Sequence, residues 1–153
     1  MVSKDSRDLP ISVVIFTKNE ELNIEDSIKS CKDFSELIVL DSGSHDKTIE
    51  IARQLEANVI NFEWNRKYPK KRQWALNNLI LKNEWVLFLD ADERITQPFV
   101  EELELKFNLL NDGYSAAEIK LSYVFLGKRL RFGAKPRKLS LLKKGYARYA
   151  ELD

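Results

Sequence analysis

Short apolar runs alternate with amphipathic segments along the first two thirds of the chain. Four runs rich in β-branched and other apolar residues predict buried strands, at 11–16, 36–40, 58–62 and 84–89. Apolar residues at helical spacing predict helices around 24–31, around 51–55 with Ser44 as a cap, from Pro69 to about Leu81, and from Pro98 onward. Strands that are apolar on both faces and alternate with such helices are typical of a mostly parallel α/β sheet flanked by helices.

The pattern changes after Gly113. Residues 114–132 alternate between polar and apolar and carry Gly127 at a position typical of a hairpin turn, and 137–149 predicts a further strand and turn. We therefore predict an α/β domain over 1–113, followed over 114–153 by a β-rich, basic extension with an antiparallel hairpin.

Charge is distributed unevenly along the 153 residues, although the net charge is only +1. Up to Glu118 the chain has 15 basic and 22 acidic residues, whereas from Ile119 onward it has 10 basic and 2 acidic ones. The two parts are therefore expected to meet different partners. A hydrophobic content of 44% is enough for a sizeable core and argues against a disordered chain.

Three features of the sequence bear on the cellular compartment of the protein. Cys31 is the single cysteine, so no internal disulfide is possible, and its neighbours at helical spacing predict a core position. No apolar run approaches the roughly 18–20 residues that cross a bilayer. The polar N-terminus lacks the apolar core of a signal peptide. These features predict a cytoplasmic protein, with contact to the inner face of the membrane left open.

Polar residues follow three of the four predicted strands. The groups are Thr17, Lys18, Asn19 and Glu20 after the first strand, Asp41, Ser42, Gly43 and Ser44 after the second, and Asp90, Asp92 and Glu93 after the fourth. In a parallel sheet the carboxyl ends of the strands share one edge, where ligands bind. We therefore expect the three groups to meet.

Asp90 and Asp92 stand two residues apart, directly after the five apolar residues 85–89. Two carboxylates in one small region repel each other, and a divalent cation relieves the repulsion. Mg²⁺ prefers oxygen ligands and commonly combines one or two carboxylates with water and phosphate oxygens. The pair thus predicts a site for Mn²⁺ or Mg²⁺ that carries a diphosphate. The alternative is that these acids only solvate a strand end.

Four segments together resemble a known family. They are "VVIFTKNEELNIEDSIKS", "ELIVLDSGSHDKTIEIA", "KKRQWALN" and "WVLFLDADER", and their order is similar to that of family 2 glycosyltransferases of the GT-A (Rossmann-like) fold. Among these, the chain most resembles the lipopolysaccharide-core glucosyltransferase type, which acts in cell-surface polysaccharide biosynthesis. The resemblance covers roughly residues 11–149.

The resemblance implies roles for individual residues. Those expected around the nucleotide are Thr17, Asn19, Glu20, Asp41, Ser42, Lys71, Arg72 and Asp90, with Gln73 and Trp74 in the segment beside the diphosphate or sugar. Asp92, with Asp90, would hold the metal ion. The alternative for residues 70–72 is a solvated helix start. His45 departs from the usual pattern of the family, and either touches substrate or is solvated.

The resemblance also implies transfer from a nucleotide-sugar donor, with UDP-sugar as the expected donor, to a saccharide or lipid-linked acceptor with inversion. The acceptor hydroxyl then needs a general base. In the glucosyltransferase type a His–Glu pair follows the segment matched here by "LLKKGYARY", whereas this chain ends at Asp153. We therefore expect the chain to bind nucleotide but transfer sugar poorly. Glu93 is a candidate base by proximity only.

The basic segment 119–150 interleaves its cations with aromatic residues. It fits an anionic lipid surface or a phosphorylated acceptor, or else lysine-rich edge strands that resist aggregation. No nucleic acid is expected, because no recognised nucleic-acid motif accompanies the charge.

Three other functions fit parts of the pattern. A phosphatase of the haloacid dehalogenase type would use Asp90 as nucleophile, but its motif normally follows the first strand. A nucleotidyltransferase usually has a glycine-rich loop after the first strand, which "TKNEEL" lacks. A nucleotide-binding module without a catalytic base is the alternative that is not an enzyme.

Overall fold

The computed structural model describes residues 7–67, 70–133 and 135–149. Its strands are β1 (Leu9–Thr17), β2 (Phe34–Asp41), β3 (Asn58–Asn61), β4 (Trp85–Asp90), β5 (Ala116–Lys120), β6 (Val124–Phe125), β7 (Lys128–Arg129) and β8 (Arg137–Lys143). Its helices are α1 (Ile24–Ser30), α2 (Thr48–Gln54), α3 (Lys71–Asn78) and α4 (Gln97–Gly113). The predicted alternation of strands and helices is confirmed.

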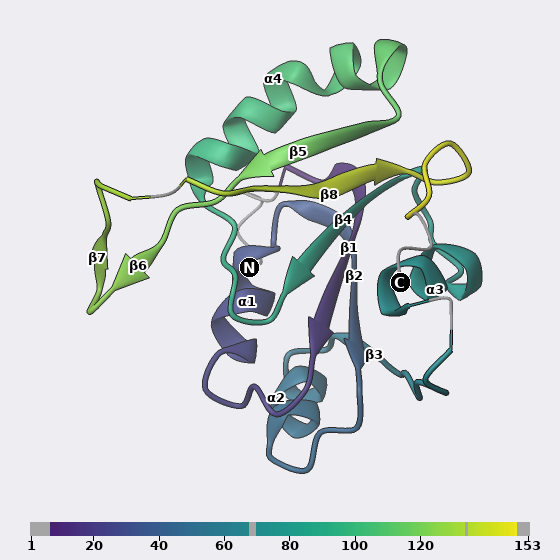
Figure 1. Ribbon diagram of the computed structural model, residues 1–153, viewed down its shortest axis with the longest axis vertical. Coiled ribbons are helices and arrows are strands. Elements are labelled where there is room, and N and C mark those ends of the chain that lie inside the picture. The colour runs from purple at the N-terminus through teal and green to yellow at the C-terminus, as the bar shows by residue number, and fades with distance from the viewer. Residues whose placement is uncertain (1–6, 68–69, 134, 150–153) are drawn as a thin grey trace, which may run out of the picture.

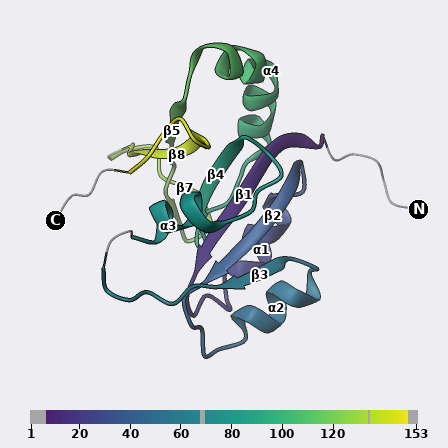
Figure 2. The same cartoon turned by 90° about the vertical axis from the view of Figure 1, so that its right-hand side faces the viewer.

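Six strands form one mixed sheet in the order β3-β2-β1-β4-β8-β5 (Figure 1). The four strands from β3 to β4 are parallel, and Figure 2 shows them following one another across the sheet. β8 pairs antiparallel with both β4 and β5. Each parallel connection passes through a helix, as parallel strands require.

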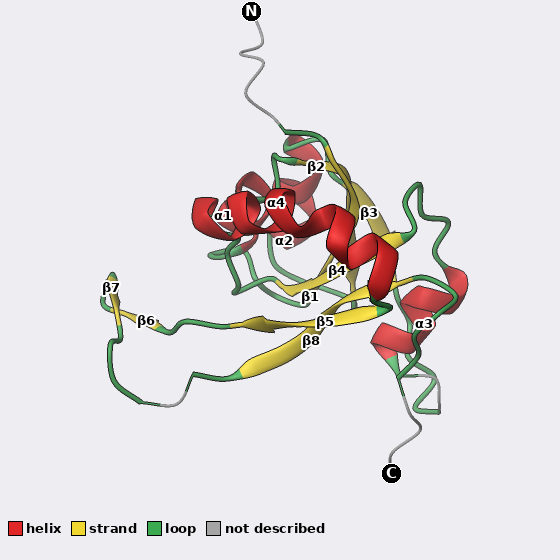
Figure 3. Ribbon diagram, turned by 90° about the horizontal axis from the view of Figure 1, so that it is seen from above, coloured by secondary structure: helices red, strands yellow, loops and turns green. Residues whose placement is uncertain are grey.

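Both faces of the sheet are covered, because side chains along the central strands alternate between two apolar clusters. On β4, Leu87 belongs to the cluster beneath α1, α2 and α4, whereas Phe88 belongs to the cluster beneath α3. Figure 3 shows α3 on the opposite side of the sheet from the other three helices. The prediction of buried strands that are apolar on both faces is thus confirmed for β1, β2 and β4. It is wrong for β3, whose residues are exposed or only partly buried because it lies at the edge of the sheet. Cys31 is buried in the first cluster as predicted.

Two predicted helix boundaries are wrong. Ser44 does not cap α2, which begins at Thr48, because its hydroxyl is bonded to Asp41 within the preceding loop. α3 ends at Asn78 and not near Leu81, since the backbone of Leu79 is already extended. Pro69, predicted in the first turn of that helix, lies outside the described residues.

The segment after Gly113 continues the main sheet. β8 lies against β4, and β5 forms the sheet edge beyond it. β6 and β7 form a separate two-stranded hairpin, whose turn residues Leu126 and Gly127 have φ values of 47° and 73°. Positive φ at both positions is typical of a two-residue hairpin turn, so the predicted turn at Gly127 is confirmed. The division of function between 1–113 and 114–153 stays a prediction.

The hairpin of β6 and β7 extends away from the rest of the molecule in two views (Figures 1 and 3). Within the described ranges, none of the helices combines the length and the apolar character that crossing a bilayer demands.

Candidate functional site

The carboxyl ends of β1, β2 and β4 meet at one edge of the sheet, as predicted. Thr17 is in register with Asp41, and Phe16 is in register with Asp90. Hydrogen bonds continue this register past the strands, since the amide of Ala91 donates to Phe16 O at 3.1 Å. The three polar groups that follow these strands are therefore neighbours.

The loops after β1 and β2 hold each other through side chains. The Asn19 amide N–H donates to the Ser44 hydroxyl, and the His45 amide donates to Asn19 Oδ1, both at 2.8 Å. The Glu20 amide donates to Thr48 Oγ1, also at 2.8 Å. Asn19 has a φ of 54°, a left-handed conformation that asparagine tolerates better than most residues. Asn19 thus supports the loop structure, and the exposed His45 contributes its backbone.

Asp41 is almost completely buried and is held by its own loop. Its carboxylate accepts hydrogen bonds from the amides of Gly43 at 2.8 Å and Ser44 at 2.9 Å, and from the Ser44 hydroxyl. The neighbouring Thr17 is also buried, and among the described residues nothing bonds to its hydroxyl. Thr17 therefore offers an uncommitted polar group at the site, whereas Asp41 is satisfied internally.

A cavity of about 650 Å³ opens beside these strand ends. Its lining comes from the loops after β1 and β2 and from the segment between β3 and α3, and consists of Lys18, Ser42, Gly43, Asn61, Phe62, Glu63, Trp64, Arg66, Lys70 and Lys71. This volume lies within the usual range for small-molecule sites, and its lining combines aromatic, cationic and hydroxyl groups.

Lys71 lies between the cavity and the strand ends. Its ammonium donates to Thr17 O at 3.3 Å and lies 5.3 Å from the centroid of the Phe16 ring. Burial lowers the pKa of Lys71 to about 8, although the negative charges of Asp41 and Asp90 oppose this shift. The side chain is therefore a cation at neutral pH that loses its proton more easily than an exposed lysine.

Of the next three residues of α3, one contacts the strand ends and two fix the position of the helix. Arg72 reaches Asp90, whereas Gln73 accepts a hydrogen bond from the Tyr149 amide at 2.7 Å and is buried. Trp74 packs edge-on against Phe62, with ring centroids 5.0 Å apart. Of the predicted segment, Lys71 and Arg72 thus face the strand ends, while the next two residues anchor the helix.

Asp90 is bound by two cations. Arg72 Nη2 lies 3.1 and 3.2 Å from its two carboxylate oxygens, and Lys138 Nζ lies 2.5 Å from Oδ2. Burial alone would raise the pKa of Asp90, but the hydrogen bond and charge of Lys138, together with Arg72, hold that pKa below its ordinary value. Asp90 is therefore an ionised carboxylate whose charge is balanced within the protein.

Sequence reasoning missed Lys138, which also binds Glu93. Its ammonium lies 2.8 and 2.9 Å from the two Glu93 oxygens. Leu87 of β4 is in register with Leu141 of β8, and because the two strands run antiparallel, the start of β8 with Lys138 lies toward the end of β4 with Asp90. The basic character of this segment was visible in the sequence, but the signal needed to find Lys138 was the antiparallel pairing of β8 with β4.

Asp92 has a different environment from Asp90. It is exposed, and no hydrogen bond or ion pair to another described residue involves it. The described part of the chain contains no cluster of three or more His, Cys, Asp or Glu residues placed to hold a metal ion. A cation at this edge would find Asp92 open and Asp90 already engaged, and would need further ligands from a bound molecule.

Glu93 supports the turn after β4. Its Oε2 accepts the Asp90 amide at 2.8 Å, and both of its oxygens contact Lys138. Both carboxylate oxygens of Glu93 are therefore engaged by groups of the protein itself. The geometry thus favours a structural role for the residue that proximity alone suggested as a base.

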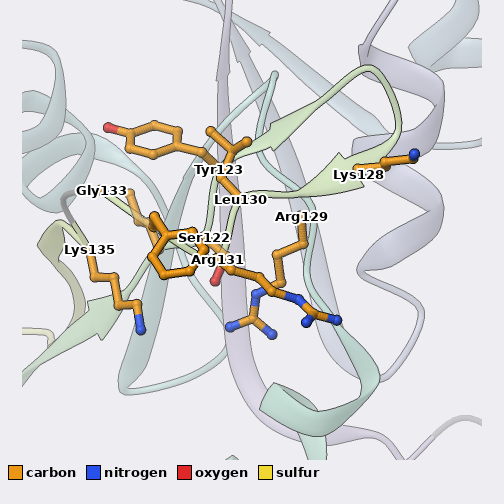
Figure 4. Close-up of a pocket in the computed structure, with 10 residues that line it drawn as sticks. Ser122, Tyr123, Lys128, Arg129, Leu130, Arg131, Gly133 and Lys135 are labelled. Atoms are coloured by element: carbon orange, nitrogen blue, oxygen red, sulfur yellow. The ribbon is translucent and has the colours of Figure 1, made fainter.

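A second cavity, of about 690 Å³, lies along the hairpin of β6 and β7 (Figure 4). Its lining residues are Leu121, Ser122, Tyr123, Lys128, Arg129, Leu130, Arg131, Phe132, Gly133 and Lys135. In Figure 4, Arg129 and Arg131 extend to one side of the ribbon and Leu130 to the other. The hairpin is therefore amphipathic, and it offers cations away from the edge formed by the parallel strands.

Comparison with known proteins agrees with this geometry. The model of the family described as Glycosyl transferase family 2 matches residues 12–134. An uncharacterized glycosyltransferase of Rickettsia bellii is 42% identical over 113 residues, which cover 72% of this chain and 37% of that protein. The lipopolysaccharide core biosynthesis glycosyltransferase LpsC of Rhizobium meliloti is 28% identical over 149 residues, which cover 92% of this chain and 53% of LpsC. The chain thus spans about a third to a half of the length of these relatives.

A solved structure shows the same fold. Glucosyl-3-phosphoglycerate synthase from Mycobacterium tuberculosis, in complex with Mn²⁺, UDP and glucosyl-3-phosphoglycerate, superposes with a TM-score of 0.54 at 29% identity. The match covers 69% of this chain and 42% of that one. The predicted GT-A architecture, a mostly parallel sheet flanked by helices, is confirmed.

Proposed function

The chain belongs to glycosyl transferase family 2, and we propose that it forms the donor-binding part of an enzyme that transfers a sugar from a nucleotide-sugar to a saccharide acceptor. The observation that carries this proposal is the meeting of three strand ends beside an open cavity, with Lys71 and Arg72 next to Asp90. Cationic donors at such an edge suit the diphosphate of a nucleotide.

The donor in this proposal is a UDP-sugar. The structural relative from M. tuberculosis was crystallised with UDP, and the cavity of this chain lies beside the carboxyl ends of its parallel strands. We assign Thr17, Ser42 and the loop held by Asn19, Glu20 and Asp41 to the nucleoside side. Thr17 supports this assignment, because its buried hydroxyl has no partner among the described residues.

Lys71 and Arg72 are proposed to stabilise the departing diphosphate. Sugar transfer leaves a negative charge on the nucleotide, and fixed cations at the position where charge develops lower the barrier. Both side chains already point at the carboxyl ends of β1 and β4, since Lys71 contacts Thr17 and Arg72 contacts Asp90. Their positions therefore need little rearrangement on binding.

The described residues fit a Mn²⁺ or Mg²⁺ ion that arrives with the nucleotide. Asp92 is exposed and uncommitted, and Mg²⁺ commonly uses one or two carboxylates while phosphate and water oxygens complete its shell. Asp92 would hold the ion directly, with Asp90 beside it. Such an ion, when bound, neutralises charge on the leaving diphosphate.

We further propose inversion at the anomeric carbon, with a general base outside the pair of Asp90 and Glu93. Both carboxylates are already engaged by Lys138, and Glu93 also accepts a hydrogen bond from the Asp90 amide. The base would then be a carboxylate elsewhere in the whole protein. The alternative, a nucleotide-binding module without a base, predicts nucleotide affinity without transfer.

The acceptor is proposed to be a saccharide on a lipid or surface polymer, of the lipopolysaccharide-core type. LpsC supports this assignment by its similarity along most of the chain. We place the protein in the cytoplasm, at the inner face of the membrane, where segment 119–150 would contact the lipid surface. The buried, unpaired Cys31 suits a reducing compartment.

Calorimetry with UDP and Mn²⁺ tests the proposed function. The wild-type chain should bind UDP, and Asp92→Asn together with Asp90→Asn should weaken binding at least about tenfold in the presence of Mn²⁺, because an open metal ligand and the partner of Arg72 are lost. Asp112→Asn together with Glu56→Gln removes the same two negative charges from exposed positions away from the carboxyl ends of the parallel strands and is the control. Unchanged UDP affinity in the double variant would contradict the proposal.

The phosphatase alternative gives Asp90 a different role, that of a nucleophile. It requires Asp90 to attack phosphorus and become a covalent acyl-phosphate. Both oxygens of Asp90 contact cations, and the family match supports sugar transfer instead. A phosphorylated Asp90, detected by mass spectrometry after incubation with a phosphoryl donor, would favour the phosphatase.

A further inference from the structure

One lysine from the far end of the chain neutralises the acids that follow β4. Lys138 lies in β8, and its side chain is only 15% exposed. Its ammonium contacts Asp90 at 2.5 Å and Glu93 at 2.8 and 2.9 Å. A lysine with so little exposure needs carboxylate partners, because an unpaired charge is costly to bury. Lys138 and the two acids therefore stabilise one another.

These contacts occupy the oxygen atoms that a divalent cation would otherwise use. Asp90 Oδ2 is bound by both Lys138 and Arg72, and Arg72 also contacts Oδ1. Glu93 binds Lys138 through both oxygens and the Asp90 amide through Oε2. The Asp90 side chain is still 42% exposed, but of the three acids in this turn only Asp92 has no hydrogen bond or ion pair to another described residue.

We propose that Lys138 is a resident counter-ion and positioning residue, which makes the binding of a divalent cation at this edge depend on a bound nucleotide. In the nucleotide-free protein the tethered ammonium holds Asp90 and Glu93, so that a cation finds one carboxylate, Asp92. One carboxylate is too few for a tight protein-only site, whereas diphosphate oxygens supply the missing ligands. The proposal rests on the nucleotide-binding function, and it adds an order in which the ligands bind.

The contacts also explain why the counter-ion stays in place. Lys138 is anchored by the backbone of β8, and β8 is paired with both β4 and β5. An ammonium held at this position by the sheet does not diffuse away when a metal ion approaches, unlike a counter-ion from solution. The same contacts keep Asp90 beside Arg72, where we place the diphosphate end of the donor.

The test is the affinity of the nucleotide-free protein for Mn²⁺, measured from the spectrum of free Mn²⁺ by electron paramagnetic resonance. Lys138→Met keeps most of the apolar stem and removes the charge. Glu93 then loses its cationic partner and Asp90 keeps Arg72, so the two acids become more open to a metal ion. The affinity for Mn²⁺ should rise about tenfold, the size of effect typical of residues that orient metal ligands. A purely structural role for Lys138 predicts the opposite, because disorder of the acids would weaken binding.

Two variants serve as controls. Lys138→Arg keeps a cation on the same strand and should leave the Mn²⁺ affinity close to that of the wild type. Lys120→Met removes the same charge from an exposed position on β5, so it reports the effect of net charge alone. An equal rise in Lys120→Met, or no rise in Lys138→Met, would overturn the proposal.

The wild-type protein provides a measurement that does not depend on whether Lys138→Met folds. Its Mn²⁺ affinity should be weak alone and should increase at least about tenfold with saturating UDP. Tight binding of Mn²⁺ by the nucleotide-free wild type would refute the inference. Failure of UDP to bind would instead refute the proposed function, and the comparison of Lys138→Met with Lys120→Met would still test the counter-ion.

Discussion

Asp90 accepts hydrogen bonds from two cationic side chains, Arg72 of α3 and Lys138 of β8, and Lys71 lies close enough for its charge to act on the same carboxylate. At the residue scale, the site is therefore a network of paired charges in which the pKa values of Asp90 and Lys71 depend on their neighbours. Burial is the largest single influence on both pKa values. It prevails at Lys71, whereas at Asp90 the two cations together outweigh it.

Because of the lowered pKa of Lys71, both the free energy of unfolding and the affinity for a diphosphate should depend on pH. The pKa of Lys71 falls from 10.5 to about 8 on folding, so between these values the unfolded chain binds a proton that the folded chain has lost. This group's contribution to the free energy of unfolding therefore rises as the pH increases from about 8 to 10.5. The same loss of charge weakens the attraction of Lys71 for a diphosphate.

We predict that UDP affinity, measured by calorimetry without metal, falls several-fold between about pH 7 and pH 9, because one charge-assisted contact is lost. Lys71→Arg should flatten this dependence, since an arginine stays protonated throughout the range. Asp41, Asp90, Arg72 and Lys18 are the charged groups that act on Lys71. If UDP affinity falls just as steeply with pH in Lys71→Arg, a group other than Lys71 causes the pH dependence.

At the scale of elements, β8 completes the site. It enters the sheet beside β4 in the antiparallel direction, with Leu142 in register with Val86 and Leu141 with Leu87. Leu141 joins the apolar cluster on one face and Leu142 the cluster on the other. The strand therefore contributes to both cores, and its docking carries Lys138 to the acids.

Leu142→Ala should lower the free energy of unfolding by about 2–5 kcal/mol, because it leaves a cavity in a packed cluster. Leu139→Ala, on the same strand but 40% exposed, should cost much less. Urea denaturation followed by circular dichroism measures both. An equal loss in the free energy of unfolding for the two substitutions would show that Leu142 of β8 is not packed in the core in solution.

At the scale of the whole molecule, the parallel edge and the hairpin offer two different surfaces. The hairpin presents large apolar side chains to solvent, among them Leu126 and Phe132, which are 86% and 92% exposed. The same segment carries four cations, Lys128, Arg129, Arg131 and Lys135, and no acidic residue. A two-stranded hairpin is marginally stable alone, and this combination suits an anionic lipid surface.

We predict that the protein sediments with vesicles of phosphatidylcholine and phosphatidylglycerol but not with phosphatidylcholine alone. Arg129→Gln with Arg131→Gln should abolish sedimentation, and so should Leu126→Ser with Phe132→Ser, since both charge and apolar insertion contribute. Ile80→Ser, which replaces an equally exposed apolar residue outside the hairpin, is the control. Equal binding to neutral vesicles, or loss of binding in the control, would contradict membrane contact through the hairpin.

Local patterns in the sequence were sufficient for the four parallel strands and for the edge at which their polar residues meet. Apolar runs with side chains directed to both faces predict buried parallel strands, and parallel strands with helical crossovers must end at the same edge. The meeting of Thr17, Asp41 and Asp90 follows from this topology. The turn at Gly127 was equally predictable, because its preference for positive φ is a property of the residue itself.

Tertiary structure alone decided how the charges at this edge are paired. Lys138 and Asp90 are 48 residues apart, and they meet because β8 docks antiparallel beside β4 in one particular register. Likewise, only the tertiary structure shows that Asp41 is a buried acceptor for the amides of its own loop, while its nucleotide contact, which the family resemblance implied, stays a prediction. Periodicity encodes which face a residue occupies, whereas the partner of a charge depends on the docking and register of segments distant in sequence, which no local pattern specifies.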